Sequence, residues 1–253
     1  MQTLGCMTLL AILATTIVAY FLFVRDKSVE RYLHLNHELA LFLAHLLILT
    51  LRDRTSLPVT CKLVAGALQW LFLVQFAFMA LEAMQAYSIR AAVLPKGSLL
   101  NRRQLGAIGW LLPGLYAAAC TLLWHPSYAS AWSCWLNLGH RIALASILPV
   151  AGLAAIAIIL VEASGMDAKR ASLPGQDRHQ RTAAVANSQA LVLMLPVSLG
   201  SWYTGLYAVY EANVALYGIV AALNISLAIC IFAFHTLGNP KVHAFFSRYL
   251  PCL

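Results

Sequence analysis

Seven apolar runs fill almost the whole of this 253-residue chain, and each is long enough to cross a lipid bilayer. A spanning helix needs about 20 mostly apolar residues, because a helix rises 1.5 Å per residue and the hydrocarbon core is about 30 Å thick. The runs are continuous rather than alternating, which favours helices over the strands of a membrane barrel. We therefore predict an all-α membrane protein, a seven-transmembrane helical bundle, with spans at residues 3–24, 32–51, 61–88, 105–124, 142–163, 187–208 and 214–236.

The composition leaves no room for a second, water-soluble domain. Hydrophobic residues make up 61% of the chain and charged residues 10%, so a soluble fold would have too little polar surface to cover its interior. We expect one bundle over residues 1–238 and a short amphipathic helix with a tail over residues 239–253. In that segment a cap and first-turn proline precede an apolar face typical of a helix on a membrane surface, which consists of Val242, Phe245, Phe246 and Tyr249.

The basic residues predict how the bundle is oriented. Thirteen of the 17 Lys and Arg residues lie in the first, third and fifth connections and in the tail, and four lie in the other connections. By the positive-inside rule, the N-terminus is expected outside and the C-terminus in the cytoplasm. Topology thus explains the net charge of +8 better than nucleic-acid binding does. The first run could also be a secretory signal peptide, which would leave six spans, but Arg25, Asp26 and Lys27 resemble a membrane stop rather than a cleavage site.

Two cysteines fall on the predicted outer side. Cys61 begins the third span, and Cys134 lies in the connection between the fourth and fifth spans. Disulfides persist in oxidising compartments, so we expect a bridge that ties this loop over the mouth of the bundle. The alternative is two unpaired thiols.

Three ionisable side chains are expected at one depth near the cytoplasmic face. His34 opens the second span, and His235 closes the seventh. Glu82 follows Cys61 by about 31 Å of helix, which brings it to the same face. Ionisable groups within spans are costly and usually functional. One interpretation is a polar latch, a contact that holds the helix ends together until a signal breaks it; Glu38, one turn after His34, could join it.

The other interpretation of these three side chains is a zinc site. Two imidazoles and a carboxylate can bind zinc with one position open for water, as a membrane hydrolase would require. The sequence shows no further carboxylate at this depth in the first two or last two spans and no serine-centred nucleophile motif. The latch is therefore favoured, and no metal or other cofactor is expected.

The sixth span contains a candidate moving part. Pro196 removes a backbone donor and permits a kink, and Gly200 would allow close helix approach. Trp202 lies above the kink, where a ligand could press on it. Trp70, about 13 Å below Cys61 along the third span, and Phe76 could line the same cavity.

Short strings in several spans resemble the adhesion branch of the secretin-like G-protein-coupled receptors. The resemblance covers the second to seventh spans and the tail. The strings are CKLVA at 61–65, FAFMALEA at 76–83, GWLLP at 109–113, CW at 134–135, Pro149, LP at 195–196, GSW at 200–202, GL at 205–206, LN at 223–224, IFAFH at 231–235 and NPKV at 239–242. Each string is weak alone, but all of them occur in the family's order.

The resemblance implies a plasma-membrane receptor without enzymatic chemistry. A peptide agonist at the outer cavity would open the cytoplasmic end to a heterotrimeric G protein. In adhesion-type receptors the peptide is usually a tethered segment, and we expect any such segment to lie outside this chain. The implied ligand-binding residues are Trp70, Phe76, Trp135, Trp202 and Asn224. The conformational-switch residues that we expect are those of the latch, His34, Glu82 and His235, and those of the kink, Pro196 and Gly200.

Basic residues of the predicted cytoplasmic loops would face the G protein, or would anchor the loops to anionic lipid. They are Arg90, Arg102, Arg103, Lys169 and Arg170. Three alternatives to a signalling receptor remain at this point: a signalling-silent truncated receptor, a metal-dependent membrane hydrolase, and a transporter. A transporter would be expected to show internal repeats or paired broken helices, which we do not find.

Overall fold

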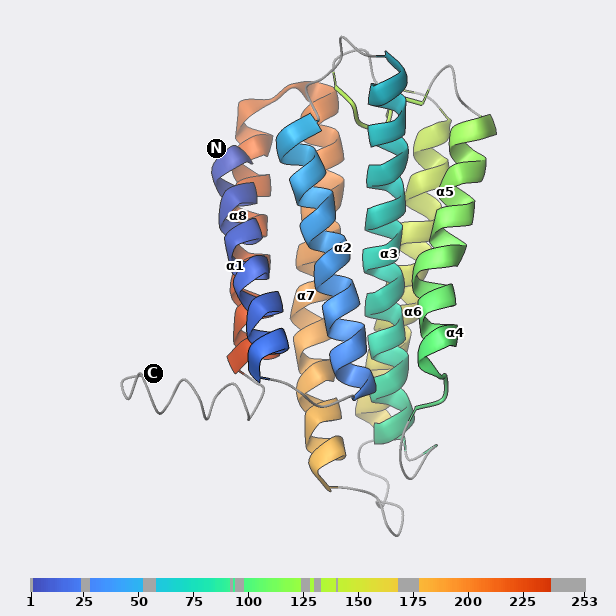
Figure 1. Cartoon of the computed structure of the whole chain (residues 1–253), viewed down its shortest axis with the longest axis vertical. Helices are drawn as coiled ribbons and strands as arrows, with labels where there is room; N and C mark the ends of the chain where they lie inside the picture. The colour runs from blue at the N-terminus through green and yellow to red at the C-terminus, as the bar shows by residue number, and fades with distance from the viewer. Residues whose placement is uncertain are drawn as a thin grey trace.

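A computed structural model describes residues 2–23, 28–51, 58–91, 93, 98–123, 128–129, 133–139, 141–167 and 178–237. Over these residues the chain forms a bundle of long helices (Figure 1). Seven of the described helical stretches are long and apolar enough to cross a membrane, which confirms the predicted fold class. The helices are α1 (Gln2–Phe23), α2 (Val29–Leu51), α3 (Pro58–Arg90), α4 (Arg102–Gly106), η1 (Ala107–Leu111), α5 (Leu112–Leu123), α6 (Ile142–Asp167), α7 (Arg178–Glu211), α8 (Val214–Ile231) and η3 (Phe232–Leu237).

Two spans are composite, and polar caps start them. The fourth span runs through α4, one π turn and α5, and the seventh runs through α8 into a second π turn. Asn101 caps α4 and forms a capping box with Gln104, in which each side chain satisfies the other's backbone amide. Asn213 caps α8 through the Ala215 amide. Such caps supply the acceptors that the first turn of a helix otherwise lacks.

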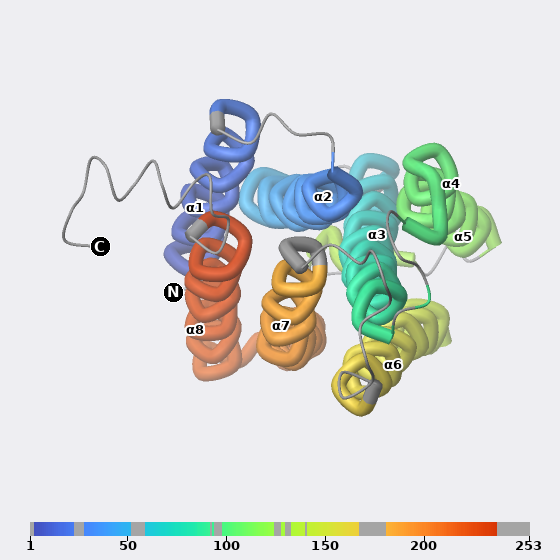
Figure 2. The backbone as a smooth tube through the Cα atoms, turned by 90° about the horizontal axis from the view of Figure 1, so that it is seen from below, coloured from blue at the N-terminus to red at the C-terminus, as the bar shows by residue number. Residues whose placement is uncertain are grey.

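Helix α3 is the central element of the bundle. Figure 2 shows it between α2 and α6, with α5 on one flank and α7 on the other. Of its most apolar stretch, 78% is buried inside the bundle, a larger share than in any other described span. Because α3 is a single long helix, it connects Cys61 near one end of the bundle with Glu82 near the other. We call these the disulfide end and the cluster end.

The connections alternate between the two ends. Helices α1, α3, α6 and α8 begin at the disulfide end, at the top of Figure 1, and α2, α4 and α7 begin at the cluster end. The first, third and fifth connections, which together carry 11 of the 17 Lys and Arg residues, therefore join helices at the cluster end. That this end faces the cytoplasm stays a prediction.

One predicted boundary is wrong. Helix α7 begins at Arg178 rather than at residue 187, and its first turns project below the neighbouring helices in Figure 1. Polar residues of this stretch, such as Arg181, lower its hydropathy, so the pattern of apolar residues did not reveal these first turns of the helix. The predicted amphipathic helix over residues 239–253 lies outside the described residues.

Close packing of α1 against α8 depends on Gly5. A Cβ atom built on Gly5 would lie 2.6 Å from Cα of Ala221, a backbone atom that cannot move aside alone. Small residues permit such close approach between membrane helices. We expect Gly5→Ala to lower the free energy of unfolding by about 1–3 kcal/mol, as overpacking of a tight core does.

Thermal unfolding of the purified protein in detergent would check this prediction. Gly152→Ala in α6 is the matched control, because a Cβ atom at Gly152 would meet nothing within 4 Å. Equal melting temperatures for the Gly5 variant and the wild type would contradict the close approach.

Candidate functional site

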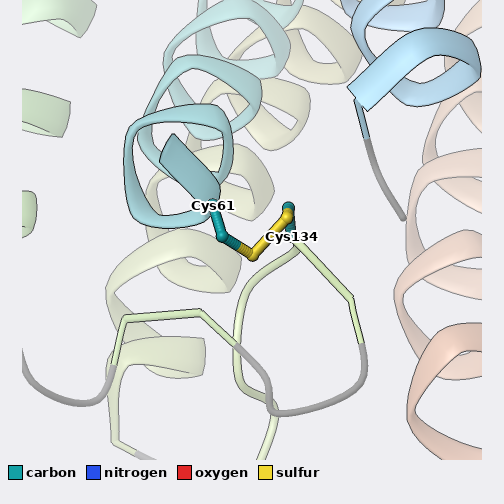
Figure 3. The surroundings of a disulfide bond; sticks show 2 residues. All are labelled: Cys61 and Cys134. Carbon is teal, nitrogen blue, oxygen red and sulfur yellow. A yellow bond between two sulfur atoms is a disulfide. The ribbon is translucent and has the colours of Figure 1, made fainter. Parts of the chain in front are cut away.

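The disulfide end is closed by the predicted bridge. Cys61 at the start of α3 is bonded to Cys134, 73 residues later, and their Cα atoms are 4.6 Å apart (Figure 3). The prediction of this disulfide is confirmed.

Near the disulfide, the buried Tyr128 hydroxyl donates to Gln69 Oε1 of α3. Burial raises the pKa of Tyr128 to about 12, so the phenol is neutral at physiological pH and holds the loop on α3.

Below the bridge lies a group of aromatic and polar side chains from several helices. Trp135, Trp202 and Asn224 line one small cavity of about 20 Å³, and a second of about 10 Å³ adjoins both indoles. The fully buried Phe76 packs edge-on against Trp202, with ring centroids 6.3 Å apart. Four of the five predicted ligand-binding residues therefore lie together. Each cavity has room for about one water molecule, so the described conformation is closed at this end.

Trp70 does not belong to this group, and the prediction that it lines the same cavity is wrong. Its Nε1 donates to the Trp110 carbonyl oxygen at 3.1 Å, and the two indoles pack edge to face. Successive helical residues turn by about 100°, so Trp70 and Phe76, six residues apart, point about 120° away from each other. Trp70 accordingly faces the fourth span.

At the cluster end, three histidines and two glutamates meet inside the bundle. We call His34, His37, Glu38, Glu82 and His235 the His–Glu cluster. His235 Nδ1 lies 2.9 Å from Glu38 Oε1, and His37 Nδ1 lies 3.4 Å from Glu82 Oε1. The rings of His34 and His235 stack with centroids 4.0 Å apart. Both glutamates and His37 are 0% exposed, and His235 is 2% exposed, so these pairs join α2 to α3 and to η3 without contact with solvent.

Further contacts connect this cluster to two more helices. The Tyr20 hydroxyl at the end of α1 donates to the His235 carbonyl oxygen at 2.9 Å and lies 3.2 Å from His34 Nδ1. On its other side, His34 Nε2 lies 3.2 Å from Asn187 Oδ1 of α7. These contacts tie together five elements, α1, α2, α3, α7 and η3.

The expectation that His34, Glu82 and His235 reach one place is confirmed, since a ligand atom of each lies within 4.8 Å of the others. Glu38 was expected only as an optional member, and it is the direct partner of His235. His37 was not expected as a member. The position of Glu38 and His37 inside an apolar span could have indicated their membership, because buried ionisable residues in a membrane require partners.

The predicted hinge in α7 is less distinctive than expected. The helix is continuous through Pro196, whose ring lies on the exposed side of α7. A Cβ atom on Gly200 would meet only Leu223 at 3.5 Å, an ordinary contact. A glycine at position 200 is therefore not needed for helix packing in this conformation, and its role as a switch residue stays a prediction.

Three of the predicted G-protein-facing residues, Arg90, Arg102 and Arg103, lie at the cluster end, outside the buried network. Arg90 donates to Ser164 Oγ at 3.1 Å, and Arg102 donates to the Ser28 carbonyl oxygen at 3.4 Å. Arg102 and Arg103 are exposed. The predicted G-protein-facing residues Lys169 and Arg170 lie outside the described residues.

Comparison with known proteins agrees with this architecture. A family model described as "7 transmembrane receptor (Secretin family)" matches residues 1–235. Adhesion G-protein coupled receptor D1 of Bos taurus is 27% identical over 249 residues, which are 97% of this chain and 28% of that receptor. Adhesion G protein-coupled receptor L1 of Mus musculus is 26% identical over 236 residues, 92% of this chain and 16% of that receptor. Adhesion G protein-coupled receptor E3 of Homo sapiens is 32% identical over 138 residues, 53% of this chain and 21% of that receptor.

This chain spans less than a third of the length of these relatives. The family match nevertheless extends from the first helix to His235, and so includes both the disulfide and the His–Glu cluster. Members of this family are receptors, so the hydrolase alternative is wrong. The relatives that it matches are adhesion receptors, and the chain itself belongs to the secretin family of seven-transmembrane receptors, which are multi-pass proteins of the plasma membrane.

Proposed function

We propose that this chain transmits a signal from the disulfide end of the bundle to a heterotrimeric G protein at the cluster end, which faces the cytoplasm. The carrying observation is the His–Glu cluster, whose two His–Glu pairs join three separate spans near the end where the G protein would bind. A G protein must enter between helix ends, so a network that ties these ends together favours the silent conformation.

The disulfide end supplies the complementary half of this proposal. The cavities beside Trp202 are too small for a peptide, so an agonist would have to displace the indole and its neighbour Phe76. A ligand can shift the population only by preferring the open conformation. A G protein that prefers the same conformation then reports agonist binding. The agonist would be a peptide, as the family resemblance implies.

Glu82→Gln is expected to raise agonist-independent G-protein activation about tenfold, since loss of about 1.4 kcal/mol from the closed state changes the ratio of states by that factor. The measurement is dissociation of G-protein subunits, compared across subtypes, in cells with matched surface amounts of each variant. Glu162→Gln is the control, because Glu162 is an exposed carboxylate on α6 near the same end.

Two outcomes would contradict the proposal. If neither the wild type nor the Glu82 variant activates a G protein, although both reach the cell surface, the chain is a receptor that cannot signal. Antibody access to tags at both termini of intact cells would show that the termini lie on one side, and would exclude the proposed orientation.

A further inference from the structure

We propose that His34, Glu82 and His235 form a zinc-binding site inside the His–Glu cluster. One nitrogen of each imidazole and a carboxylate oxygen of Glu82 already lie within 4.8 Å of one another. Zinc accepts this set of ligands and retains a fourth position for water. The inference extends beyond the proposed signalling function, because it concerns a ligand of the bundle itself and is tested without a G protein.

Two of the three proposed zinc ligands have an atom that is free to bind the metal. His235 Nε2 and Glu82 Oε2 are buried and have no hydrogen-bond partner among the described residues. An unpartnered polar atom in the interior normally costs free energy. A metal ion would satisfy both atoms at once.

Glu38 prepares His235 for metal binding. The contact with Glu38 Oε1, 2.9 Å long, is made by His235 Nδ1, and an ionised Glu38 carboxylate, which only accepts hydrogen bonds, would hold the His235 proton on that nitrogen. The lone pair is then on Nε2, the unpartnered nitrogen. Metal-binding histidines are oriented in this way by a carboxylate on their other nitrogen. His37 Nδ1 lies 3.4 Å from Glu82 Oε1 and so places an imidazole beside the carboxylate ligand.

His34 can join these two ligands at little cost. Both of its contacts, to Tyr20 and to Asn187, are 3.2 Å long, at the weak end of the hydrogen-bond range. Ligand atoms on a tetrahedral zinc ion lie about 3.3 Å apart, given zinc–ligand bonds of about 2.0–2.1 Å. Binding therefore requires the three side chains to draw together by about 1.5 Å, which small rotations of the side chains can provide.

Charge also favours a divalent cation. Glu38 and Glu82 place two carboxyl groups in a water-free interior, where an ionised carboxylate is stable only when it is paired. One zinc ion balances both. The imidazole ligands favour zinc over magnesium and calcium, which prefer oxygen ligands only.

This inference revises the expectation of no metal. From the sequence, the three ligands could be placed with Glu38 only as an optional neighbour, and a zinc site was linked to hydrolysis. The structure adds Glu38 as the partner of His235 and His37 as the neighbour of Glu82. The bound ion would join α2, α3 and η3; if the proposed function holds, zinc would therefore stabilise the silent conformation.

The test is zinc binding to the purified full chain in detergent, measured by calorimetry and by the melting temperature. We expect one tightly bound zinc ion per chain and a higher melting temperature, because a ligand of the native state stabilises it. Millimolar magnesium should change neither. Replacing His34 or His235 by alanine should weaken this binding at least tenfold, and Glu38→Ala should weaken it about 10- to 100-fold, because it removes the acceptor that orients His235.

His45→Ala is the matched control. His45 is a buried histidine of the same helix α2, it lies outside the cluster, and its Nδ1 contacts the Leu41 carbonyl oxygen. A wild-type chain that binds no stoichiometric zinc would overturn the proposal, and this result does not depend on any variant folding. Equal zinc affinity in the wild type and in folded His34 and His235 variants would also overturn it. Neither result would bear on G-protein activation.

Discussion

Simultaneous replacement of Cys61 and Cys134 by alanine is expected to lower the free energy of unfolding by about 4 kcal/mol. A disulfide stabilises a fold mainly by restricting the unfolded chain, and a separation of 73 residues corresponds to about 4 kcal/mol in the chain-entropy estimate. The loop that carries Cys134 also carries Trp135, which packs on Phe72. Loss of the bridge should therefore also loosen the packing of Trp135 beside Trp202.

Thermal unfolding in detergent and the fraction of protein at the cell surface are the two measurements for this variant. Cys120→Ala is the control, because Cys120 is a buried cysteine of α5 without a disulfide. Its loss removes one buried sulfur atom and should cost about 1 kcal/mol. Equal stability of the double variant and the Cys120 variant would contradict a bridge between α3 and the loop.

The position of a side chain along the bundle could be predicted from the sequence. The direction in which it points around its helix was not predicted. The rise of 1.5 Å per residue and the alternation of spans placed Cys61 with Cys134, and they placed His34 with Glu82. No comparable rule was applied to the direction in which a side chain points. Trp70 was therefore assigned to the wrong side of α3, although the 100° turn per residue between Trp70 and Phe76 already separated them.

The membership of the His–Glu cluster shows the same limit. Glu38 lies one turn after His34 and has the right depth, but only the packed bundle shows that it is the partner of His235 rather than of His34. His37 reaches Glu82 because α2 packs closely on α3. Pairing in the interior depends on contacts between helices, which the pattern of one span does not contain. The start of α7 was misplaced for a different reason, because hydropathy marks apolar residues and not the polar turns with which a helix can begin.

His235→Ala is expected to lower the free energy of unfolding by about 3–5 kcal/mol, because it leaves the buried carboxyl group of Glu38 without its partner. Most of this loss should come from the orphaned charge and not from the missing ring. Glu38→Gln keeps an acceptor oxygen for His235 Nδ1 and removes only the charge. The double variant His235→Ala, Glu38→Gln should therefore be more stable than His235→Ala alone.

A double-mutant cycle of these variants, measured by thermal unfolding, separates pairing from packing, because residues in direct contact show coupling of about 0.5–3 kcal/mol and distant ones do not. The control is a second cycle that pairs Glu38→Gln with His45→Ala. His45 is also buried, but it contacts a backbone carbonyl oxygen. We expect coupling between Glu38 and His235 and none between Glu38 and His45. Additive losses in both cycles would mean that the 2.9 Å contact does not hold α2 to η3, and the cluster could then not act as a latch.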